Sequence, residues 1–449
     1  MKKVLVLGAG MVARPLVRYL LERGFGVTQG DVAPERASAM VDDHPHGRAL
    51  ALDLRDTAAV ASLVAEHDLT VSLAPPPFHP AVARLCVEAG RHLATASYVA
   101  PEMASLDAAA RERGVLLLNE IGVDPGIDHM SAMRVIDGVR ARGGRILSFR
   151  SYCGGLPAPE ANDNPFGYKF SWAPRGVLMA GRNDAHYLVD GARVTVPGAR
   201  LFRDMRLLHV EGAGDFEAYP NRDSISYIDI YGLQGIRTML RGTLRNPGWC
   251  DCLHNYGRLG LLGIEPVDLA GATSADLLRR LAGAAPGEAA DAAVARCLGL
   301  CRDALPVANL RWLGLCDETP LGRERGCPLD VLGDAMLAKL VYAPGERDLL
   351  VMKHEFTAAL PDGGRESITS SLVAYGEPGG DSAMARTVSL PLAVGVRLVL
   401  EGGIAARGVA RPVTAEFYRP ILDELEGHGI VCQEKTERID RDTGDEGGE

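Results

Sequence analysis

The sequence predicts an α/β fold, with a Rossmann-like doubly wound parallel sheet domain joined to a mixed, mainly antiparallel α+β domain that carries a helical insertion. Three features support this prediction. A glycine-rich turn lies between an apolar run and an amphipathic segment at the amino terminus. Strand-like and helix-like segments then alternate over about the first 120 residues, as in parallel sheets. Beyond residue 145 strand-like segments follow one another without such helices, as in antiparallel sheets.

The amino-terminal glycine-rich turn predicts a dinucleotide site. The apolar run 4–7 leads into Gly8-Ala9-Gly10-Met11-Val12-Ala13, and a helix is expected over 15–23. In such a turn the first glycine allows the sharp bend, the second lets a pyrophosphate approach the backbone, and a small third residue lets helix and strand pack closely. Free N–H groups at the helix start then face the anion. A turn that binds nothing is the alternative. The predicted cofactor contacts here are Gly8, Gly10, Met11 and Val12.

Asp31, which follows the second predicted strand (26–30), bears on the choice of cofactor. An acidic residue about 20 positions after the glycines normally accepts hydrogen bonds from the ribose hydroxyls, and it repels the 2′-phosphate of NADP. Val32 adds no cation, whereas Arg36 could reach such a phosphate. The sequence therefore favours NAD over NADP. A helix or turn cap is the alternative role of Asp31.

The rest of the first domain alternates between strands and helices. Prolines 75 to 77 end the fourth strand and force a turn at its carboxyl end, where open α/β sheets bind ligands. Ala74, just before these prolines, is therefore a predicted cofactor contact. Strands are expected at 50–54, 69–73, 92–95 and 115–118, and helices at 57–66 (capped by Asp56), 80–89 and 101–114.

The loop 122–129 follows the last of these strands. Gly126 frees the backbone to approach a ligand, and Asp124 is expected to contact a substrate amine. Asp128 is expected to cap the helix that begins near His129. His129 is either a general acid or, as is commoner at the start of a helix, a hydrogen-bonded structural residue. The predicted cofactor contacts in this loop are Val123 and Pro125.

The second domain and its insertion have a different texture. The polar, proline-rich stretch 154–165 is expected to be an exposed loop, and the Leu and Ala stripes of the insertion to be packing faces. Expected strands are 146–152, 194–196, 207–210, 225–230, 348–358 and 366–375, the last two joined by a hairpin at 360–364; expected helices are 273–282, 288–300 and 332–340.

These elements suggest a division of the chain into domains. Segment 387–401 and a helix at 414–426 should return to the first domain and cover its sheet. The tail is dense in charge and glycine, which predicts disorder. The expected division is 1–123 with 387–433 for the dinucleotide domain, 124–252 with 345–386 for the sheet domain, 253–344 for the helical insertion, and 434–449 for the tail.

Composition narrows the function classes. A formal net charge of -10 argues against a nucleic-acid partner, because a phosphate backbone needs a basic face. No apolar run of membrane-spanning length and no signal-peptide pattern is evident, so we expect a cytoplasmic protein without membrane partners. Nine scattered cysteines fit that placement. No metal is expected, since no further ligand pair accompanies Cys250 and Cys252 at zinc-site spacing.

Three long motifs resemble saccharopine dehydrogenase of the glutamate-forming kind, also called saccharopine reductase. They are the loop 152–177, the run Phe216 to Ser224 and the run Arg241 to Arg245, and the resemblance extends to about Tyr418. It implies an enzyme that interconverts saccharopine with glutamate and 2-aminoadipate 6-semialdehyde through an imine, with a nicotinamide cofactor, in lysine metabolism. It also implies a Rossmann domain completed by the carboxyl-terminal segment, a sheet domain that forms a homodimer, and a helical insertion.

The resemblance also implies which residues contact saccharopine. The planar fork of arginine suits the carboxylates of this substrate. Imine formation also needs proton transfer, for which Tyr98, Asp124 or a water are the candidates. One departure concerns the cofactor, because members that use NADP have a basic residue where this chain has Asp31 and Val32. Carried over by motif, the contacts are Ser97, Tyr98 and Asp124 in the cofactor domain, and Arg222, Thr243, Leu244 and Arg245 in the sheet domain.

Several alternatives stay open at this stage. A solvated strand face is the alternative for Arg222 and Arg245, and the favoured role of Arg241. Lys169 either orients a carboxylate, acts as an acid, or forms a surface ion pair. Carboxynorspermidine or carboxyspermidine dehydrogenase would run the same reduction with a polyamine partner. A further alternative is a regulator that binds the cofactor and keeps the Rossmann fold but catalyses no reaction.

Overall fold

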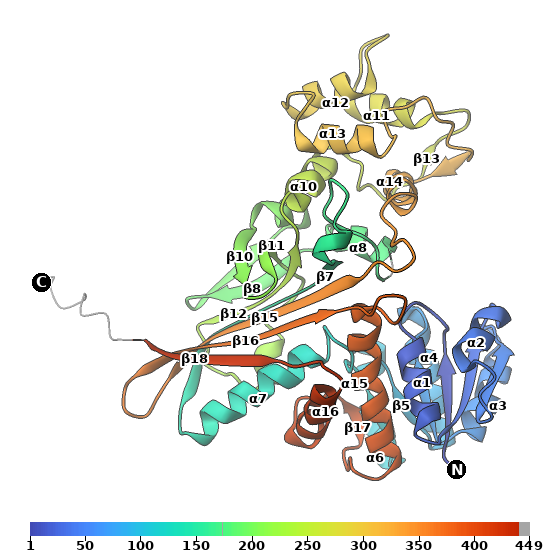
Figure 1. The fold of residues 1–449 in the computed structure, drawn as a ribbon, viewed down its shortest axis with the longest axis vertical. Coiled ribbons are helices and arrows are strands. Elements are labelled where there is room, and N and C mark those ends of the chain that lie inside the picture. The colour runs from blue at the N-terminus through green and yellow to red at the C-terminus, as the bar shows by residue number, and fades with distance from the viewer. Residues whose placement is uncertain (173, 440–449) are drawn as a thin grey trace, which may run out of the picture. The chain divides into compact units, whose positions relative to one another are not determined.

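The computed structural model describes residues 1–172 and 174–439, and its chain forms two compact units (Figure 1). The first unit comprises Met1–Arg145, Leu360–Gly364 and Ala374–Lys435. The second comprises Ile146–Ala359, Arg365–Val373 and the described residues from Thr436 onward. Each unit is described by itself.

The first unit contains a seven-stranded parallel sheet with the order β17-β6-β5-β4-β1-β2-β3. The chain runs outward from β1 to β3 and then returns to β4 on the other side of β1, so the strand order switches between β1 and β4. Open α/β sheets bind ligands at such a point. The parallel pairing and the switched strand order confirm the predicted doubly wound sheet. The strands are β1 (Lys3–Leu7), β2 (Gly26–Asp31), β3 (Gly47–Ala51), β4 (Leu69–Ser72), β5 (His92–Ala94), β6 (Leu116–Leu118) and β17 (Gly408–Ala410).

Helices pack on this sheet and close its core. Strand side chains such as Leu5 and Leu117 are fully buried against Val60, Val82 and neighbouring apolar residues. Asp56 caps α3 by accepting a hydrogen bond from the amide of Ala59, as predicted. The helices are α1 (Arg14–Glu22), α2 (Pro34–Val41), α3 (Thr57–Glu66), α4 (His79–Ala89), α5 (Pro101–Ala104), α6 (Asp107–Glu112), α7 (Ile127–Ala141), α15 (Ala383–Leu400) and α16 (Ala415–Gly427).

Two predicted elements of the first unit need correction. Strand β3 occupies Gly47–Ala51 rather than 50–54, because Asp53 accepts a hydrogen bond from the amide of Arg55 and turns the chain out of the sheet. The expected helix 101–114 is broken into α5 and α6, with Ser105 bonded to the carbonyl of Glu102 at the break.

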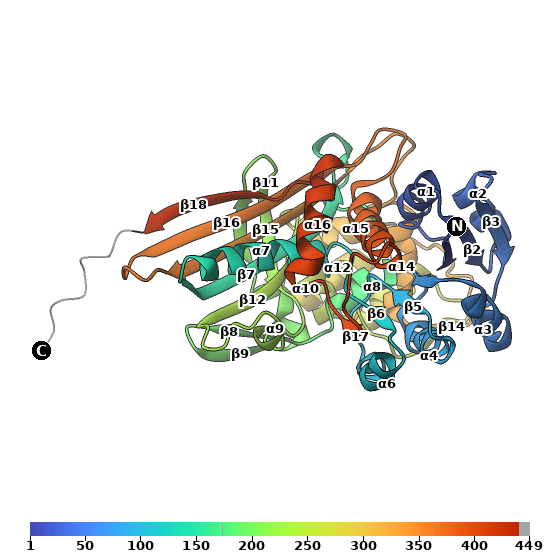
Figure 2. The same cartoon turned by 90° about the horizontal axis from the view of Figure 1, so that it is seen from below.

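Helix α15 returns the chain to the first unit and packs beside α1 and α16 (Figure 2). Contrary to the expectation from sequence, it is long and apolar enough to cross a membrane. However, 72% of this 18-residue helix is buried within the structure, as in the core helix of a folded domain. Its apolar composition is explained by that burial.

The second unit is built on a nine-stranded mixed sheet with the path β10-β11-β12-β7-β15-β16-β18, from which β8 pairs with β12 and β9 with β8. Strands β12 and β7 run parallel, whereas β11 runs antiparallel to both of its neighbours, β10 and β12. The strands are β7 (Arg145–Pro157), β8 (Ala185–Val189), β9 (Ala192–Val196), β10 (Arg206–Val210), β11 (Gly214–Pro220), β12 (Thr238–Arg245), β15 (Asp348–Ala359), β16 (Arg365–Tyr375) and β18 (Gln433–Ile439).

A helical segment gathers at one end of this unit (Figure 1). Its helix α11 begins with a capping box, in which Thr273 and Asp276 each bond the other's backbone amide. The short helix α8 (Pro174–Ala180) and a two-stranded sheet of β13 (Val267–Asp268) and β14 (Arg325–Gly326) also belong to the unit. The segment contains α10 (Trp249–Leu259), α11 (Ser274–Ala282), α12 (Ala290–Leu298), α13 (Leu305–Trp312) and α14 (Pro328–Leu337).

Three predictions for the second unit and the tail are wrong. Residues 154–157 are buried in β7 instead of an exposed loop, and a Cβ on Gly154 would lie 2.4 Å from the carbonyl oxygen of Leu244. Residues 225–230 form a turn and the short helix α9 (Tyr227–Ile230), because the Asp223 carboxylate accepts the amides of the two residues that precede this helix. From Glu434 to Ile439 the tail is the charged edge strand β18 rather than disordered chain, and 440–449 lie outside the described residues.

Candidate active site

The glycine-rich turn lies at the point where the strand order switches. Gly8 adopts φ +100°, and a Cβ there would lie 2.9 Å from the carbonyl oxygen of Leu73 at the end of β4. A Cβ on Gly10 would meet nothing within 4 Å, so the space over this residue is open. Ala13, which precedes α1 in the chain, is fully buried. These are the properties that a pyrophosphate site requires, so the residues present fit a dinucleotide.

Asp31 caps two turns, which was the alternative role weighed for it, while its predicted role at the ribose stays a prediction. Its Oδ2 accepts the amide of Ala9 at 2.7 Å, and its Oδ1 accepts the amide of Ala33 at 2.9 Å. The carboxylate therefore ties the glycine turn to the residue that precedes α2. Each oxygen keeps a further lone pair that can accept from a ribose hydroxyl. Val32 next to it is 67% exposed, and Arg36 in α2 is exposed.

The loop after β6 contains a tight turn at Gly126, a position that only glycine can occupy. Gly126 adopts φ +147°, and a Cβ there would lie 2.0 Å from the carbonyl oxygen of Gly122. The amide of Gly122 in turn donates to the carbonyl of Pro125 at 2.8 Å. Val123 and Pro125 are buried, and Asp124 is half-buried between them. The turn thus fixes the backbone that carries three of the predicted site residues.

Tyr98 and Asp124, the two predicted catalytic residues, lie next to each other. The Tyr98 hydroxyl donates to Oδ1 of Asp124 at 3.5 Å. Ser97 precedes Tyr98, and both are half-buried in the loop that follows β5. Ala74 is 8% exposed at the end of β4. The first unit therefore places Ala74, Ser97, Tyr98 and Asp124 after the carboxyl ends of β4, β5 and β6, whereas the predicted contacts of the glycine turn follow β1.

His129 is part of a buried network rather than an exposed acid. It is 0% exposed, and its Nε2 lies 2.9 Å from Oε2 of Glu120. The other Glu120 oxygen accepts the Arg411 guanidinium at 2.7 Å and the amide of Val99 at 3.0 Å. Asp128 Oδ1 accepts the amides of Gly126 and His129, at 2.5 and 2.8 Å, so it holds the loop as a cap does.

This network changes the ionisation of Glu120. Burial alone would raise the pKa of this carboxyl group. The hydrogen bond with His129 and the positive charge of Arg411 outweigh burial and lower the pKa to about 2. Glu120 therefore stays ionised and continues to hold the Val99 segment.

In the second unit, Arg245 is a buried cation on β12. It is 4% exposed, and its Cζ lies 5.0 Å from the ring centroid of Tyr168 and 5.6 Å from that of Trp249. Its Nη1 donates to the carbonyl of Leu244 at 2.7 Å, and its Nε has no hydrogen-bond partner among the described residues. No carboxylate of the described chain is bonded to it. Leaving such a cation unpaired is costly, so its surroundings fit an anionic ligand.

The acidic residue that pairs with Arg245 across the β11–β12 ladder binds backbone amides instead of the guanidinium. Glu217 lies directly opposite Arg245 in the β11–β12 ladder. Its carboxylate accepts the amides of Gly248 and Cys250, at 2.8 and 2.7 Å, at the start of α10. Glu217 is thus a helix cap, which explains why a buried arginine is left with aromatic neighbours instead of a salt bridge.

The other predicted contacts of the second unit occupy varied environments. Arg222 is exposed and adopts a left-handed backbone conformation, with φ +51°. Thr243 is half-buried and Leu244 is fully buried on β12. Arg241 is 7% exposed, with its Cζ 4.3 Å from the ring centroid of Tyr227, so the predicted solvated strand face is wrong for it. Lys169 forms ion pairs with Glu346 and Asp163, as in the ion-pair alternative, but it is 3% exposed and therefore does not lie on the surface.

Residues that the sequence did not single out contribute to both units. In the first unit His79 bridges Ser72 and Ser97, and Glu120 holds the Val99 segment. In the second unit Tyr168 and Trp249 flank Arg245. His79 and Glu120 could have been found from their positions in the sequence, because both follow the carboxyl ends of predicted strands.

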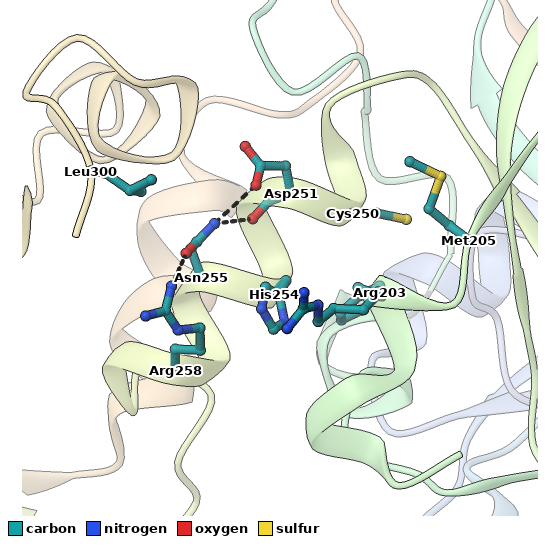
Figure 3. Close-up of a pocket in the computed structure, with 9 residues that line it drawn as sticks. Arg203, Met205, Cys250, Asp251, His254, Asn255, Arg258 and Leu300 are labelled. Atoms are coloured by element: carbon teal, nitrogen blue, oxygen red, sulfur yellow. Dashed lines mark hydrogen bonds between the residues drawn. The ribbon is translucent and has the colours of Figure 1, made fainter. Parts of the chain in front are cut away.

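The second unit also contains a cavity of about 630 Å³ beside α10 (Figure 3). Asn255 Nδ2 donates to the carbonyl and to Oδ1 of Asp251, at 2.9 and 3.0 Å, and Arg258 donates to Asn255. None of the predicted contacts lines this cavity. Among the described residues, no group of three or more His, Cys, Asp or Glu side chains could hold a metal ion. The lining residues are Phe202, Arg203, Met205, Cys250, Asp251, His254, Asn255, Arg258 and Leu300.

Comparison with known proteins decides the family. A family model described as "Saccharopine dehydrogenase C-terminal domain" matches residues 122–430, and one described as "Saccharopine dehydrogenase NADP binding domain" matches residues 4–118. The Pyricularia oryzae saccharopine dehydrogenase (NADP(+), L-glutamate-forming) is 39% identical over 97% of this chain and 99% of its own length. The chain belongs to the saccharopine dehydrogenase family.

Further relatives extend the likeness within the saccharopine dehydrogenase family. The solved structure of apo saccharopine dehydrogenase (L-Glu forming) from Saccharomyces cerevisiae superposes with a TM-score of 0.88 at 35% identity, covering 97% of this chain and 100% of that one. The mitochondrial alpha-aminoadipic semialdehyde synthase of Bos taurus is 38% identical over 96% of this chain, which corresponds to 47% of that longer protein. The resemblance predicted from the sequence motifs is confirmed, and neither alternative function is supported by these relatives.

Proposed function

We propose that the protein is a saccharopine dehydrogenase of the glutamate-forming kind, which interconverts saccharopine with glutamate and 2-aminoadipate 6-semialdehyde. The observation that carries the proposal is Arg245, a buried cation without a carboxylate partner among the described residues. Saccharopine is rich in carboxylates, and the guanidinium fork binds a carboxylate through two hydrogen bonds. Full-length likeness to relatives with this name supports the same substrate.

In the proposed mechanism the protein positions the reactants and handles protons. The bound nicotinamide supplies or accepts the hydride. Arg222, Arg245 and Thr243 would hold substrate carboxylates, and Leu244 would contact the substrate beside them. Tyr98 and Asp124, joined by their hydrogen bond, would move the protons that imine formation or hydrolysis requires. Ser97 would orient the substrate from the same loop.

We infer that the cofactor is NADP(H), held by the glycine turn and the loops that carry Ala74, Val123 and Pro125. The family model of the first domain and the names of the fungal relatives support NADP. The preference for NAD inferred from Asp31 is therefore not retained. Asp31 already accepts two backbone amides, which offset part of its charge and so lessen its repulsion of a 2′-phosphate. Arg36 is the candidate cation for that phosphate.

We propose a cytoplasmic homodimer that pairs through the mixed sheet of the second unit. The resemblance to the family supports this assembly. No nucleic-acid or membrane partner is proposed, in keeping with the formal net charge of -10 and with the burial of α15.

The test follows NAD(P)H absorbance with purified protein and saccharopine, run in parallel with NADP and NAD. Production of NADPH from saccharopine supports the function, and a higher kcat/KM with NADP than with NAD supports the cofactor. Absence of turnover with either cofactor, in both directions, would overturn the proposed function.

A further inference from the structure

His79 is a buried histidine at the start of α4, bonded to a serine on each side. Its Nδ1 lies 2.8 Å from Oγ of Ser72 at the end of β4, and its Nε2 lies 2.8 Å from Oγ of Ser97 after β5. His79 is 4% exposed and Ser72 is 0% exposed. Three polar side chains from three elements thus form one continuous chain that ends at Ser97, a predicted substrate contact.

Hydrogen-bond accounting assigns the protons along this chain. A neutral imidazole has one N–H donor and one acceptor nitrogen. Burial lowers the pKa of His79 to about 4, so the ring is neutral near pH 7. The hydroxyl hydrogen of Ser72 has no acceptor among the described residues other than Nδ1 of His79. Because a buried donor must be satisfied, Ser72 donates to Nδ1, and Nε2–H then donates to Ser97.

This assignment determines what Ser97 can offer a ligand. Its Oγ accepts from His79, so its own hydrogen points away from the imidazole. The backbone of Ser97 is also held, because its amide donates to Thr95 Oγ1 at 3.3 Å and its carbonyl accepts the amide of Glu120 at 3.1 Å. The hydroxyl is therefore a fixed hydrogen-bond donor at the carboxyl edge of the sheet.

We propose that His79 is a positioning residue that fixes the Ser97 hydroxyl as a hydrogen-bond donor to a carboxylate of the substrate. This inference rests on the proposed function, since saccharopine, glutamate and the semialdehyde all carry carboxylates. The other tautomer would turn Ser97 into a donor toward His79 and leave the substrate facing a lone pair. Such an arrangement would repel a carboxylate.

The tautomer can be read directly from the 15N chemical shifts of protein labelled in histidine, with His79 assigned from the spectrum of a His79→Gln variant. The Nε2–H form is expected. His67 provides an internal reference, because it should have the opposite tautomer, with the proton on Nδ1. Its Nδ1 lies 2.6 Å from the carbonyl of Leu63, which can only accept a hydrogen bond, and its Nε2 lies 2.8 Å from the Thr28 hydroxyl. A His79 ring in the Nδ1–H form would overturn the proposal.

Kinetics test whether the assignment matters to the substrate. For His79→Phe we expect the KM for saccharopine to rise about tenfold, as for loss of one hydrogen bond to a charged group, with the KM for the cofactor unchanged. His79→Gln, which can still donate to Ser97, should recover part of the loss. His67→Phe removes another buried histidine, distant in sequence from Ser97, and serves as the matched control with an unchanged KM.

A double-mutant cycle separates positioning from general damage. If His79 acts through Ser97, then His79→Phe in a Ser97→Ala background should change the KM for saccharopine by less than about twofold. Equal effects in both backgrounds, or an unchanged KM in folded His79→Phe protein, would overturn the proposal. Wild-type protein that does not turn over saccharopine would instead overturn the proposed function, so the two failures are distinguishable.

Discussion

The carboxylate of Asp31 accepts a hydrogen bond of 2.7 Å from the backbone amide of Ala9, inside the glycine turn of the dinucleotide site. This bond makes a residue of β2 part of the surface that the cofactor must approach. The negative charge remains close to where a 2′-phosphate would lie. Asp31 therefore shapes the turn, and we expect its charge to limit the affinity for NADP.

The first prediction is that Asp31→Asn raises the preference for NADP over NAD about tenfold. The amide oxygen of the substituted side chain keeps one of the two backbone contacts, while the charge that repels the phosphate is removed. The measurement is the ratio of kcat/KM for the two cofactors. Asp53→Asn removes an exposed carboxylate beyond β3 that pairs with Arg55, and it should leave the ratio unchanged. An unchanged ratio in Asp31→Asn would remove this residue from cofactor selection.

The second prediction is that Arg245→Met abolishes turnover without unfolding the protein. The variant removes a buried cation that has no carboxylate partner among the described residues, and replacing such a charge by an apolar chain is often neutral or stabilising. Thermal unfolding should occur at or above the wild-type temperature, while kcat/KM for saccharopine falls at least about a hundredfold. A normal rate would show that Arg245 does not bind substrate.

Arg206→Met is the matched control for this variant. Arg206 also stacks on a ring, with its Cζ 5.0 Å from the centroid of Tyr152, but it has Glu355 as an acidic partner. Its loss should change turnover little. A fall in rate equal to that of Arg245→Met would attribute both effects to disturbance of the sheet.

The parts of this structure that sequence predicts well are those set by local pattern. The run from β1 through Gly8 and Gly10 to α1 follows from apolar spacing and turn chemistry within a single stretch of chain. The limits of β3 were wrong because they depend on pairing with β2, and the helix at Tyr227 depends on the side chain of Asp223. Local propensity does not contain the pairing of β3 with β2, whereas the bonds of Asp223 are local and were masked by the strand-like composition of 225–230.

The supporting residues of the site illustrate the same limit. The buried charge of Glu120 is paired with Arg411, which lies 291 residues away along the chain and comes close only when β17 joins the sheet. The role of His79 is evident only from its hydrogen bond with Ser97, which lies 18 residues later, in the loop after β5. Predicted substrate contacts such as Arg222 and Arg245 came from motif resemblance, whereas the roles of Glu120 and His79 depend on contacts between segments distant in sequence.

The third prediction concerns the open space over Gly10. Gly10→Val should fold normally, because a Cβ at this position would meet nothing within 4 Å. The added side chain occupies the space that a pyrophosphate needs, so the KM for the cofactor should rise at least about tenfold while thermal unfolding is unchanged. Gly138→Ala in α7, where a Cβ also meets nothing within 4 Å, should leave both quantities unchanged. Unchanged cofactor kinetics in Gly10→Val would place the dinucleotide elsewhere.

The fourth prediction concerns acid stability and the buried pair of Glu120 with Arg411. The pKa of Glu120 is lowered from 4.5 to about 2 in the folded protein, so its ionised form favours folding above the unfolded pKa. That contribution is lost as the pH falls from about 4.5 toward 2, and it corresponds to about 3 kcal/mol. Glu120→Gln should therefore be less stable than wild type at pH 7, with a smaller further loss across this range.

The free energy of unfolding from urea titrations at several pH values measures this difference. The gap between Glu120→Gln and wild type should narrow steadily below pH 4.5, since protonation removes the same charge from the wild-type protein. Glu318→Gln, which removes an exposed carboxylate paired with Arg279, should follow the wild-type curve. A gap that stays constant with pH would mean that Glu120 supports the Val99 loop by shape alone, without its charge.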